Sequence, residues 1–341
     1  MRPARTPTQC HEDALAEWGP PTMRPRATLP MRVLSVAAVT AASLAVAPAA
    51  LATTPGSNGR IVYSADFGTG FQLFTVAGDG SGIRQITNQP GIDHVSADWG
   101  PHGRRLVFER GAPDHVGVAL INPDGSSQHD LTPTGIQGQP AFTADGSHIV
   151  YERVLHHFTD DSLWVMRRDG TGVRRLTRNP FPGVGGDTDP NVSPDGKVVS
   201  FVRTKESSVL QALFSVHLDG THLRQLTAYS LEVAVKHDWS PDGSHIVLTT
   251  NADFVRPGDS ANLATVRPDG SGLRYLTRYR GGAVNAFAGS YSPDGRWIVY
   301  RLEDHGTYAL YKIHPDSTGR RLILSLPVKP RFIDWGSNAS G

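Results

Sequence analysis

Short runs of apolar and β-branched residues alternate with polar, glycine-containing turns along most of the chain. Leu163–Met166 is one such run, and Ala309–Ile313 is another. Runs of this length that are rich in branched and aromatic residues and bounded by turn residues are typical of β-strands. The pattern therefore predicts an all-β protein.

One type of turn recurs with an aromatic or apolar residue before it and an apolar run after it. Its most frequent sequence is Pro-Asp-Gly. Proline presets φ at the second position of a turn, and glycine suits the last position. The copies span residues 100–103, 143–146, 193–196, 240–243 and 292–295. The residues that precede them are Trp99, Phe142, Val192, Trp239 and Tyr291.

A second turn, Asp-Gly, also recurs, and each copy is followed by a Leu-Thr or Ile-Thr pair. Asp-Gly favours tight hairpins in which φ must be positive. The copies lie at 79–80, 124–125, 169–170, 219–220 and 269–270, with residues 316–319 as a looser sixth copy. The threonines are Thr87, Thr132, Thr177, Thr227 and Thr277. Each repeat therefore predicts four antiparallel strands, A to D, with the first turn between A and B and the second between C and D.

Repeats of this kind cannot bury their apolar faces alone, but they can do so when they stack radially. The segment Ser57–Tyr63 is a B strand without a preceding A strand, and Arg331–Asn338 is an A strand without a following B strand. We therefore expect a six-bladed β-propeller of four-stranded antiparallel blades, closed by the C-terminal strand, which completes the first blade.

The N-terminal segment has the features of a signal peptide. Val33–Ala47 is uncharged, follows Arg24, Arg26 and Arg32, and precedes an A-x-A cleavage pattern at residues 50–52. Residues 1–30 are long for the start of such a segment, so Met23 or Met31 is an alternative start. We expect residues 1–52 to be the signal peptide region and 53–341 a single propeller. An uncleaved membrane anchor is the alternative, but the apolar run is short for a membrane span.

This segment predicts a secreted, extracytoplasmic protein, in the periplasm or at the cell exterior. The only cysteine, Cys10, lies in the removed part, so no disulfide is expected. The formal net charge of +1 gives no reason to expect nucleic acid as a partner, and no stable membrane span is expected after cleavage. The sequence has no clear signal for oligomerisation, and we expect a monomer.

The motif Trp239–Gly243, with the flanking Ile298–Tyr300 and Asp-Gly…Leu-Thr patterns, resembles the WD40-like repeats of the TolB C-terminal propeller. The same repeats occur in prolyl oligopeptidase-type enzymes. The resemblance covers about residues 57–338 and implies the propeller fold. TolB proteins carry an α/β domain before the propeller, which the few residues between Ala52 and Gly59 cannot supply. No Gly-x-Ser-x-Gly motif follows the propeller, so the peptidase activity of the second group is not expected.

The two faces of such a propeller differ. The A–B and C–D turns form a repetitive turn face, whereas the B–C and D–A connections vary and form what we call the variable-loop face. Variable loops on a rigid scaffold usually carry function. We therefore expect binding at the variable-loop face, with His156, His157, Phe254 and Arg256 as loop candidates.

The A strands should line the central channel, and their polar residues are the second set of candidates. These are His94, Asp98, Asp187, Asp189, Lys236, His237 and Asp238. The Asp-Trp pairs, as at Asp98, Asp238 and Asp334, favour a structural role in which carboxylates bond backbone amides. Asp187 and Asp189 resemble the start of a calcium loop, although Val198 stands where the final Glu ligand would be. His156 and His157 could bind zinc, because imidazole is a suitable ligand. The alternative is that they lie in a solvated loop that binds no metal.

Two functional hypotheses follow. The first is a binding module for a protein, peptide or glycan of the cell envelope, which requires no cofactor. The second is a metal-assisted lyase or hydrolase at the channel mouth, with Lys236, His237, Asp238, His94 and Asp187 as acid, base and metal groups. No cofactor is required, and calcium is the metal that Asp187 and Asp189 could hold.

Overall fold

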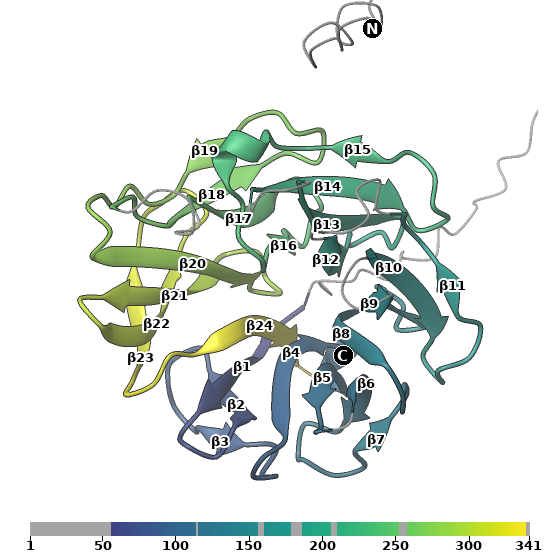
Figure 1. Ribbon diagram of the computed structural model, residues 1–341. Coiled ribbons are helices and arrows are strands. Elements are labelled where there is room, and N and C mark those ends of the chain that lie inside the picture. Colours follow the sequence, from purple (N-terminus) through teal and green to yellow (C-terminus); the bar gives the residue numbers. More distant parts are fainter. Residues whose placement is uncertain are drawn as a thin grey trace, which may run out of the picture. The chain divides into compact units, whose positions relative to one another are not determined.

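The computed structural model describes residues 56–113, 115–155, 160–178, 186–205, 210–251 and 258–338. They belong to one of two compact units of the chain, Pro48–Gly341. Figure 1 shows their strands arranged around a centre. We number the repeats 1 to 6, and their innermost A strands carry, in order, Trp335, Trp99, Phe142, Val192, Trp239 and Tyr291.

Repeat 1 joins the two ends of the described chain. The C-terminal strand β24 pairs antiparallel with β1, with Ile61 opposite Trp335. Its sheet has the order β24–β1–β2–β3. The strands are β24 (Arg331–Ser337), β1 (Asn58–Asp66), β2 (Phe71–Ala77) and β3 (Arg84–Gln85). The prediction that the C-terminal strand completes the first repeat is therefore confirmed.

Repeats 2 and 3 form one eight-stranded sheet. Each contributes four antiparallel strands, and a single parallel bridge between Val116 and Ile136 joins the two sets. The strands of repeat 2 are β4 (Asp93–Trp99), β5 (Leu106–Gly111), β6 (Val116–Ile121) and β7 (His129–Asp130). Those of repeat 3 are β8 (Ile136–Phe142), β9 (His148–Leu155), β10 (Asp160–Arg167) and β11 (Arg174–Arg175).

Repeats 4 to 6 each form a separate four-stranded sheet. Repeat 4 has β12 (Asp187–Val192), β13 (Val198–Thr204), β14 (Gln211–His217) and β15 (Arg224–Gln225). Repeat 5 has β16 (Asp238–Trp239), β17 (Ile246–Thr250), β18 (Asn262–Val266) and β19 (Arg274–Tyr275). Repeat 6 has β20 (Val284–Tyr291), β21 (Ile298–Asp304), β22 (Thr307–Ile313) and β23 (Arg321–Leu326).

The described residues thus form four separate four-stranded sheets and one sheet of eight strands, instead of six separate blades. The difference from the prediction comes from the Val116–Ile136 bridge, where the first residue of the C strand β6 meets the first residue of the next A strand, β8. An all-β propeller is confirmed, whereas the count of six blades is not settled by the sheets alone.

The hydrophobic core lies between neighbouring repeats. One cluster joins Val150 and Leu163 of repeat 3 to Phe201 of repeat 4. Another joins Val299 of repeat 6 to Trp335 of repeat 1. Corresponding clusters join repeats 1 and 2, 2 and 3, 4 and 5, and 5 and 6. Burial of apolar surface between repeats is therefore what holds the ring together.

The repeated threonine has a defined structural role. Its hydroxyl accepts a hydrogen bond from a backbone N–H of the C strand, as between Leu163 and Thr177 at 3.0 Å. The same bond forms at Thr87, Thr132, Thr227 and Thr277. The side chain thus takes the place of a backbone acceptor as the short D strand ends. In repeat 6 Leu324 stands at this position, and its outer strand β23 continues for six residues.

The A strands share a second feature that positions the site. Three residues before the aromatic, Ser96, Gln139, Asp189, Lys236 and Phe332 have positive φ values between 47° and 75°. In repeats 2, 3, 4 and 1 the A–B pairing shifts register at this point. Such a β-bulge redirects side chains relative to a regular strand.

Candidate functional site: the central channel

Hydrogen bonds cross from five of the six repeats to the next one around the channel. Asp98 Oδ2 accepts the N–H of Phe142 at 2.8 Å, and Asp238 Oδ2 accepts that of Tyr291 at 2.8 Å. Asp334 Oδ2, on the C-terminal strand, accepts the N–H of Trp99 at 2.9 Å. The predicted structural role of the Asp-Trp pairs is therefore confirmed.

Other residues occupy the same position in the remaining repeats. Ser290 Oγ accepts the N–H of Trp335 at 3.1 Å, and Asn191 Nδ2 donates to the carbonyl of His237 at 3.1 Å. Ala141 of repeat 3 has no side-chain acceptor. The ring thus depends mainly on three carboxylates that lie in a poorly solvated place.

The channel at this level is narrow. Its cavity measures ≈ 20 Å³ and is lined by Asp98, Asp238 and Asp334 among others, which leaves room for about one water molecule. Burial, followed by the neighbouring Asp334 carboxylate, raises the pKa of Asp98 well above its usual value. The same two causes raise the pKa of Asp238 to about 7. Asp238 can therefore hold a proton near neutral pH.

Lys236 supplies positive charge beside the carboxylates. It lies in the bulge at φ 75°, and its backbone N–H donates to Asp189 Oδ2 at 2.5 Å. Burial alone would lower the pKa of Lys236, but the Asp334, Asp189, Asp98 and Asp238 carboxylates raise it overall. The ammonium group therefore stays charged and offsets part of the negative charge of the channel.

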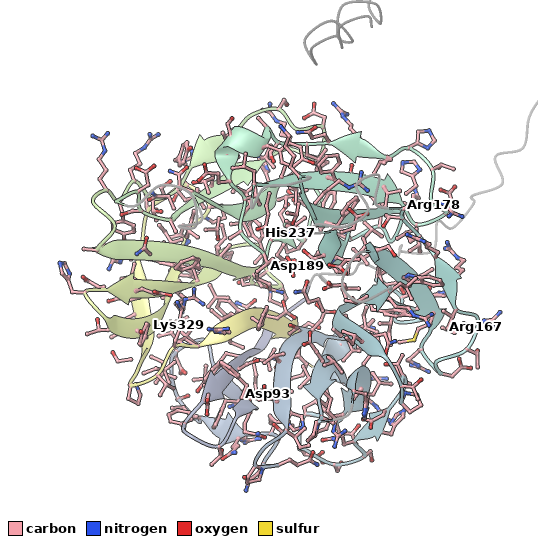
Figure 2. The ribbon with its side chains drawn as sticks, viewed as in Figure 1. Asp93, Arg167, Arg178, Asp189, His237 and Lys329 are labelled. Atoms are coloured by element: carbon pink, nitrogen blue, oxygen red, sulfur yellow. The ribbon has the colours of Figure 1, made fainter. Side chains whose placement is uncertain are left out.

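His237 lies in a hydrogen-bonded chain that has the residue types of a Ser–His–Asp triad. Its Nδ1 is 3.0 Å from Asp189 Oδ2, and its Nε2 is 2.7 Å from Ser200 Oγ. Figure 2 shows His237 and Asp189 near the centre of the ring. Burial alone would raise the pKa of Asp189, but the hydrogen bond and charge of His237 contribute to lowering it overall.

The three hydrogen-bonded side chains of Asp189, His237 and Ser200 are closed to substrate. Ser200 and His237 are both 0% exposed. Ser200 Oγ also accepts the indole N–H of Trp239 at 2.8 Å, so the hydroxyl is fixed between repeats 4 and 5. A nucleophile must reach the reacting carbonyl, and this serine is packed away from solvent. These three side chains therefore connect repeat 4 to repeat 5.

Asp187 forms a buried ion pair that the sequence did not reveal. Its two carboxylate oxygens accept from Arg203 Nε at 2.6 Å and Nη2 at 2.7 Å. Arg203 is opposite Asp187 in the β12–β13 register. Cross-strand register was the signal that could have paired them, but the bulge at residues 188–191 obscured it. To bind calcium, Asp187 would have to release Arg203 and Asp189 would have to release His237.

Metal binding by the predicted residues stays a prediction. Among the residues that the structure describes, no three His, Cys, Asp or Glu side chains form a metal-ligating group. His156, His157, Phe254 and Arg256 lie outside the described residues, so the loop candidates and the zinc alternative stay predictions as well.

His94 is buried in the core. It is 0% exposed and lies against the Phe108 ring at 5.4 Å. Burial, followed by the Arg110 charge, lowers the pKa of His94 to about 4. A neutral, buried imidazole of this kind is part of the packing between strands.

A basic cluster on the variable-loop face was not predicted from the sequence. Arg301 Nε and Lys329 Nζ lie 2.8 and 2.7 Å from the same oxygen of Glu303. The Arg301 guanidinium also lies 4.1 Å from the centre of the Phe287 ring. Lys329 is the most exposed of the three charged residues, at 37% of its side chain, and it lies away from the centre of the ring in Figure 2. We call Phe287, Arg301, Glu303 and Lys329 the basic cluster.

No helix within the described part of the chain has the length and apolar character that crossing a membrane requires.

Comparison with known proteins agrees with the architecture. Residues 134–338 match the family model for the TolB beta propeller domain. The TolB structure from Acinetobacter baumannii is 17% identical with a TM-score of 0.67, over 82% of this chain and 67% of that one. A putative TolB from Agrobacterium tumefaciens is 16% identical with a TM-score of 0.60, over 81% and 92%.

A curated relative is similar in sequence. The uncharacterized peptidase YuxL of Bacillus subtilis is 26% identical over 204 residues, which is 50% of this chain and 30% of that protein. This chain therefore spans less than a third of that relative's length. The family match covers more than half of the chain, and the chain belongs to the TolB beta propeller domain family.

Proposed function

We propose that the protein is an extracytoplasmic binding module that engages a protein, peptide or glycan of the cell envelope through its variable-loop face. In this proposal repeats 2 and 3 act as two blades despite their bridge, which gives six blades. The signal peptide pattern at residues 1–52 supports the location, and the protein acts as a monomer.

One observation carries the proposal: the candidate acid–base groups already bond other groups of the protein. Asp98 and Asp238 bond backbone amides of the next repeat, Asp187 pairs with Arg203, and His237 is buried between Asp189 and Ser200. General acid–base chemistry requires a group within reach of a substrate proton. A binding role needs none of these groups to be free.

The basic cluster indicates how such binding would start. Arg301 and Lys329 outnumber the single carboxylate of Glu303, and Arg331 adds a further cation 5.1 Å from the centre of the Phe71 ring. Basic groups beside aromatic rings suit partners that carry carboxylates. We therefore expect an acidic segment of the partner to contact this part of the face.

Site-specific photocrosslinking tests the proposal. p-Benzoylphenylalanine at Lys329 should give crosslinked adducts in the native envelope, and Arg331→Glu in the same protein should reduce them. The matched control places the photoreactive residue at Ser147, an exposed residue of a turn-face turn. Equal adducts from both positions, or none from Lys329, would refute binding at this face.

The second candidate is a hydrolase or lyase at the channel mouth, favoured by the similarity to the peptidase YuxL. Metal analysis of the purified protein separates the two. Stoichiometric metal that is lost in Asp187→Ala and His237→Ala, together with hydrolytic or lyase activity, would favour the enzyme.

A further inference from the structure

The outer strand of repeat 6 is longer than its counterparts. β23 has six residues, whereas β3, β7, β11, β15 and β19 have two each. It is the last strand of its sheet and pairs with β22 on one side, so its other side is a free edge. A long free edge presents unpaired backbone N–H and C=O groups, which another extended chain can bond.

The extra length arises where the repeated threonine is missing. In repeats 1 to 5 the D strand ends at this threonine, whose hydroxyl replaces a backbone acceptor, as at Thr177. In repeat 6 the position is Leu324, and the pairing with β22 continues to Leu326, which lies opposite Tyr308. Pro327 follows and has no N–H for further pairing. Residues 325 and 326 therefore extend the edge beyond its usual end.

The other repeats show which backbone groups of β23 point outward. In repeat 3, Leu176 and Thr177 both donate their N–H to the Leu163 carbonyl of the C strand, at 2.7 and 3.2 Å. Leu324 is the equivalent of Thr177, so its N–H points to β22. Because the direction alternates along an antiparallel strand, the N–H and C=O of Ser325 point to the free edge. Ser325 is also exposed.

The side chains beside the free edge are apolar on both surfaces of the strand. Leu324, Leu326 and Val328 pack against the core between repeats 1 and 6 and stay partly exposed. Leu322 lies opposite Tyr311, which packs toward repeat 5, and is 53% exposed. A strand added here would therefore find apolar neighbours on both surfaces, and such cross-strand pairs stabilise a sheet.

The charges around the free edge have one sign. No aspartate or glutamate occurs in residues 320–333, and the cations there are Arg320, Arg321, Lys329 and Arg331. The arginine pair precedes the edge residues, and Lys329 of the basic cluster follows them. The free edge is thus continuous with the basic cluster. Charge complementarity favours an occupant that carries carboxylates at both ends.

The same charges disfavour a second copy of this chain as the occupant. Two β23 strands paired antiparallel would bring the arginine pair of each copy to the Lys329 end of the other. Like charges that face each other across strands are destabilising. A glycan or a phosphate can bond the cations, but it lacks the alternating N–H and C=O groups of a peptide backbone.

We infer that an acidic, extended segment of a partner protein adds to repeat 6 as a fifth strand beside β23. Its backbone bonds the N–H and C=O of Ser325, its apolar side chains contact those of β23, and its carboxylates lie near Arg321 and Lys329. This inference rests on the proposed function, because it specifies how the acidic segment expected at the basic cluster is held.

The test measures the binding of a synthetic peptide to the full chain by fluorescence anisotropy. The probe is fluorescein-labelled Asp-Glu-Val-Thr-Val-Thr-Val-Glu-Asp, which has acidic ends and alternating apolar residues. Ser325→Pro removes the outward N–H and should weaken binding by about tenfold. The matched control Ser325→Ala keeps this N–H and should bind like wild type. The same peptide with lysine at each acidic position should not bind.

A second probe tests the wild-type protein, so the result does not depend on whether Ser325→Pro folds. The peptide is N-methylated at its five central residues, which keeps its charges and side chains but removes their N–H groups. It should bind at least about tenfold more weakly than the first probe. Melting curves establish that each protein variant is folded.

Three outcomes would overturn the inference: no saturable binding of the first probe, equal binding of the N-methylated probe, or equal affinities of folded Ser325→Pro and Ser325→Ala. Self-association of the free protein that Ser325→Pro abolishes would assign the edge to a second copy and overturn it as well. Crosslinks from Lys329 in the envelope, together with any of these outcomes, would leave the proposed function standing. Absent crosslinks with intact peptide binding would instead refute the proposed function.

Discussion

At the scale of single residues, buried polar groups of the channel are used as connectors. Ser200 is the clearest case, because its hydroxyl meets both His237 Nε2 and the Trp239 N–H. Ser200→Ala removes both of these contacts and should lower the free energy of unfolding by about 2–4 kcal/mol. Urea denaturation measures this loss.

Ser64→Ala is the control for that variant, because Ser64 is equally buried and its Oγ has no partner among the described residues. It should cost less than about 1 kcal/mol. A fluorophosphonate probe should leave wild-type Ser200 unlabelled. Labelling of Ser200 would contradict the interpretation that Asp189, His237 and Ser200 have only a structural role.

Asp238 makes stability depend on pH. Its pKa rises from 3.8 to about 7 in the folded state, through burial and the Asp334 carboxylate. The folded protein therefore binds more protons than the unfolded chain between these values. The stabilising contribution is complete below pH 4 and is lost as the pH rises through 7.

Asp238→Asn keeps an acceptor for the Tyr291 N–H but cannot ionise. The variant should flatten the decline in melting temperature between pH 4 and pH 7 by several degrees. Melting curves across this range, at constant ionic strength, provide the measurement. Parallel profiles for the variant and wild type would show that Asp238 does not titrate in this window.

At the scale of elements, the C–D turns set the spacing of the repeats. The Asp-Gly glycines have φ between 81° and 90°. A Cβ on Gly270 would lie 2.5 Å from the Leu226 carbonyl of the preceding repeat. In repeat 6 the same position is Ser317, at φ 77°, which is a costly conformation for a residue with a side chain.

Ser317→Gly should therefore stabilise the protein by about 1 kcal/mol, or roughly 2–4 °C in melting temperature. Ser325→Gly, in the strand β23 of the same repeat, is the control and should destabilise by about 0.5–1 kcal/mol. A lower melting temperature for Ser317→Gly would mean that the serine side chain contributes more than its backbone strain costs.

The elements were largely predictable from the sequence, because turn chemistry is local. Pro-Asp-Gly and Asp-Gly marked both turns, and the Asp-Trp pairs indicated the carboxylate ring. The contacts between Asp187 and Arg203 and between His237 and Ser200 were not predictable. They depend on a bulge and on the packing of one repeat against the next, which periodicity does not specify. The Val116–Ile136 bridge is likewise a product of packing.

At the scale of the whole molecule, the C-terminal strand joins repeat 1 to repeats 6 and 2. Trp335 packs with Val299 of repeat 6, Asp334 bonds Trp99 of repeat 2, and Asn338 donates to the Ser57 carbonyl. Deleting residues 328–341 removes all three contacts and exposes the edge of β1. An unpaired edge promotes association between chains.

The truncated protein should therefore melt at least about 10 °C lower and elute from size exclusion as larger species. Its loss combines a buried tryptophan, about 3–5 kcal/mol, with the exposed strand edge. Asp334→Ala tests the closing bond alone and should cost about 1–3 kcal/mol without association, because β24 stays in place. A truncation that keeps the wild-type melting temperature and solubility would show that the ring does not depend on this strand. A small loss in Asp334→Ala with a large loss in the truncation would assign closure to apolar packing by Trp335, with the hydrogen-bonded ring setting only the register between repeats.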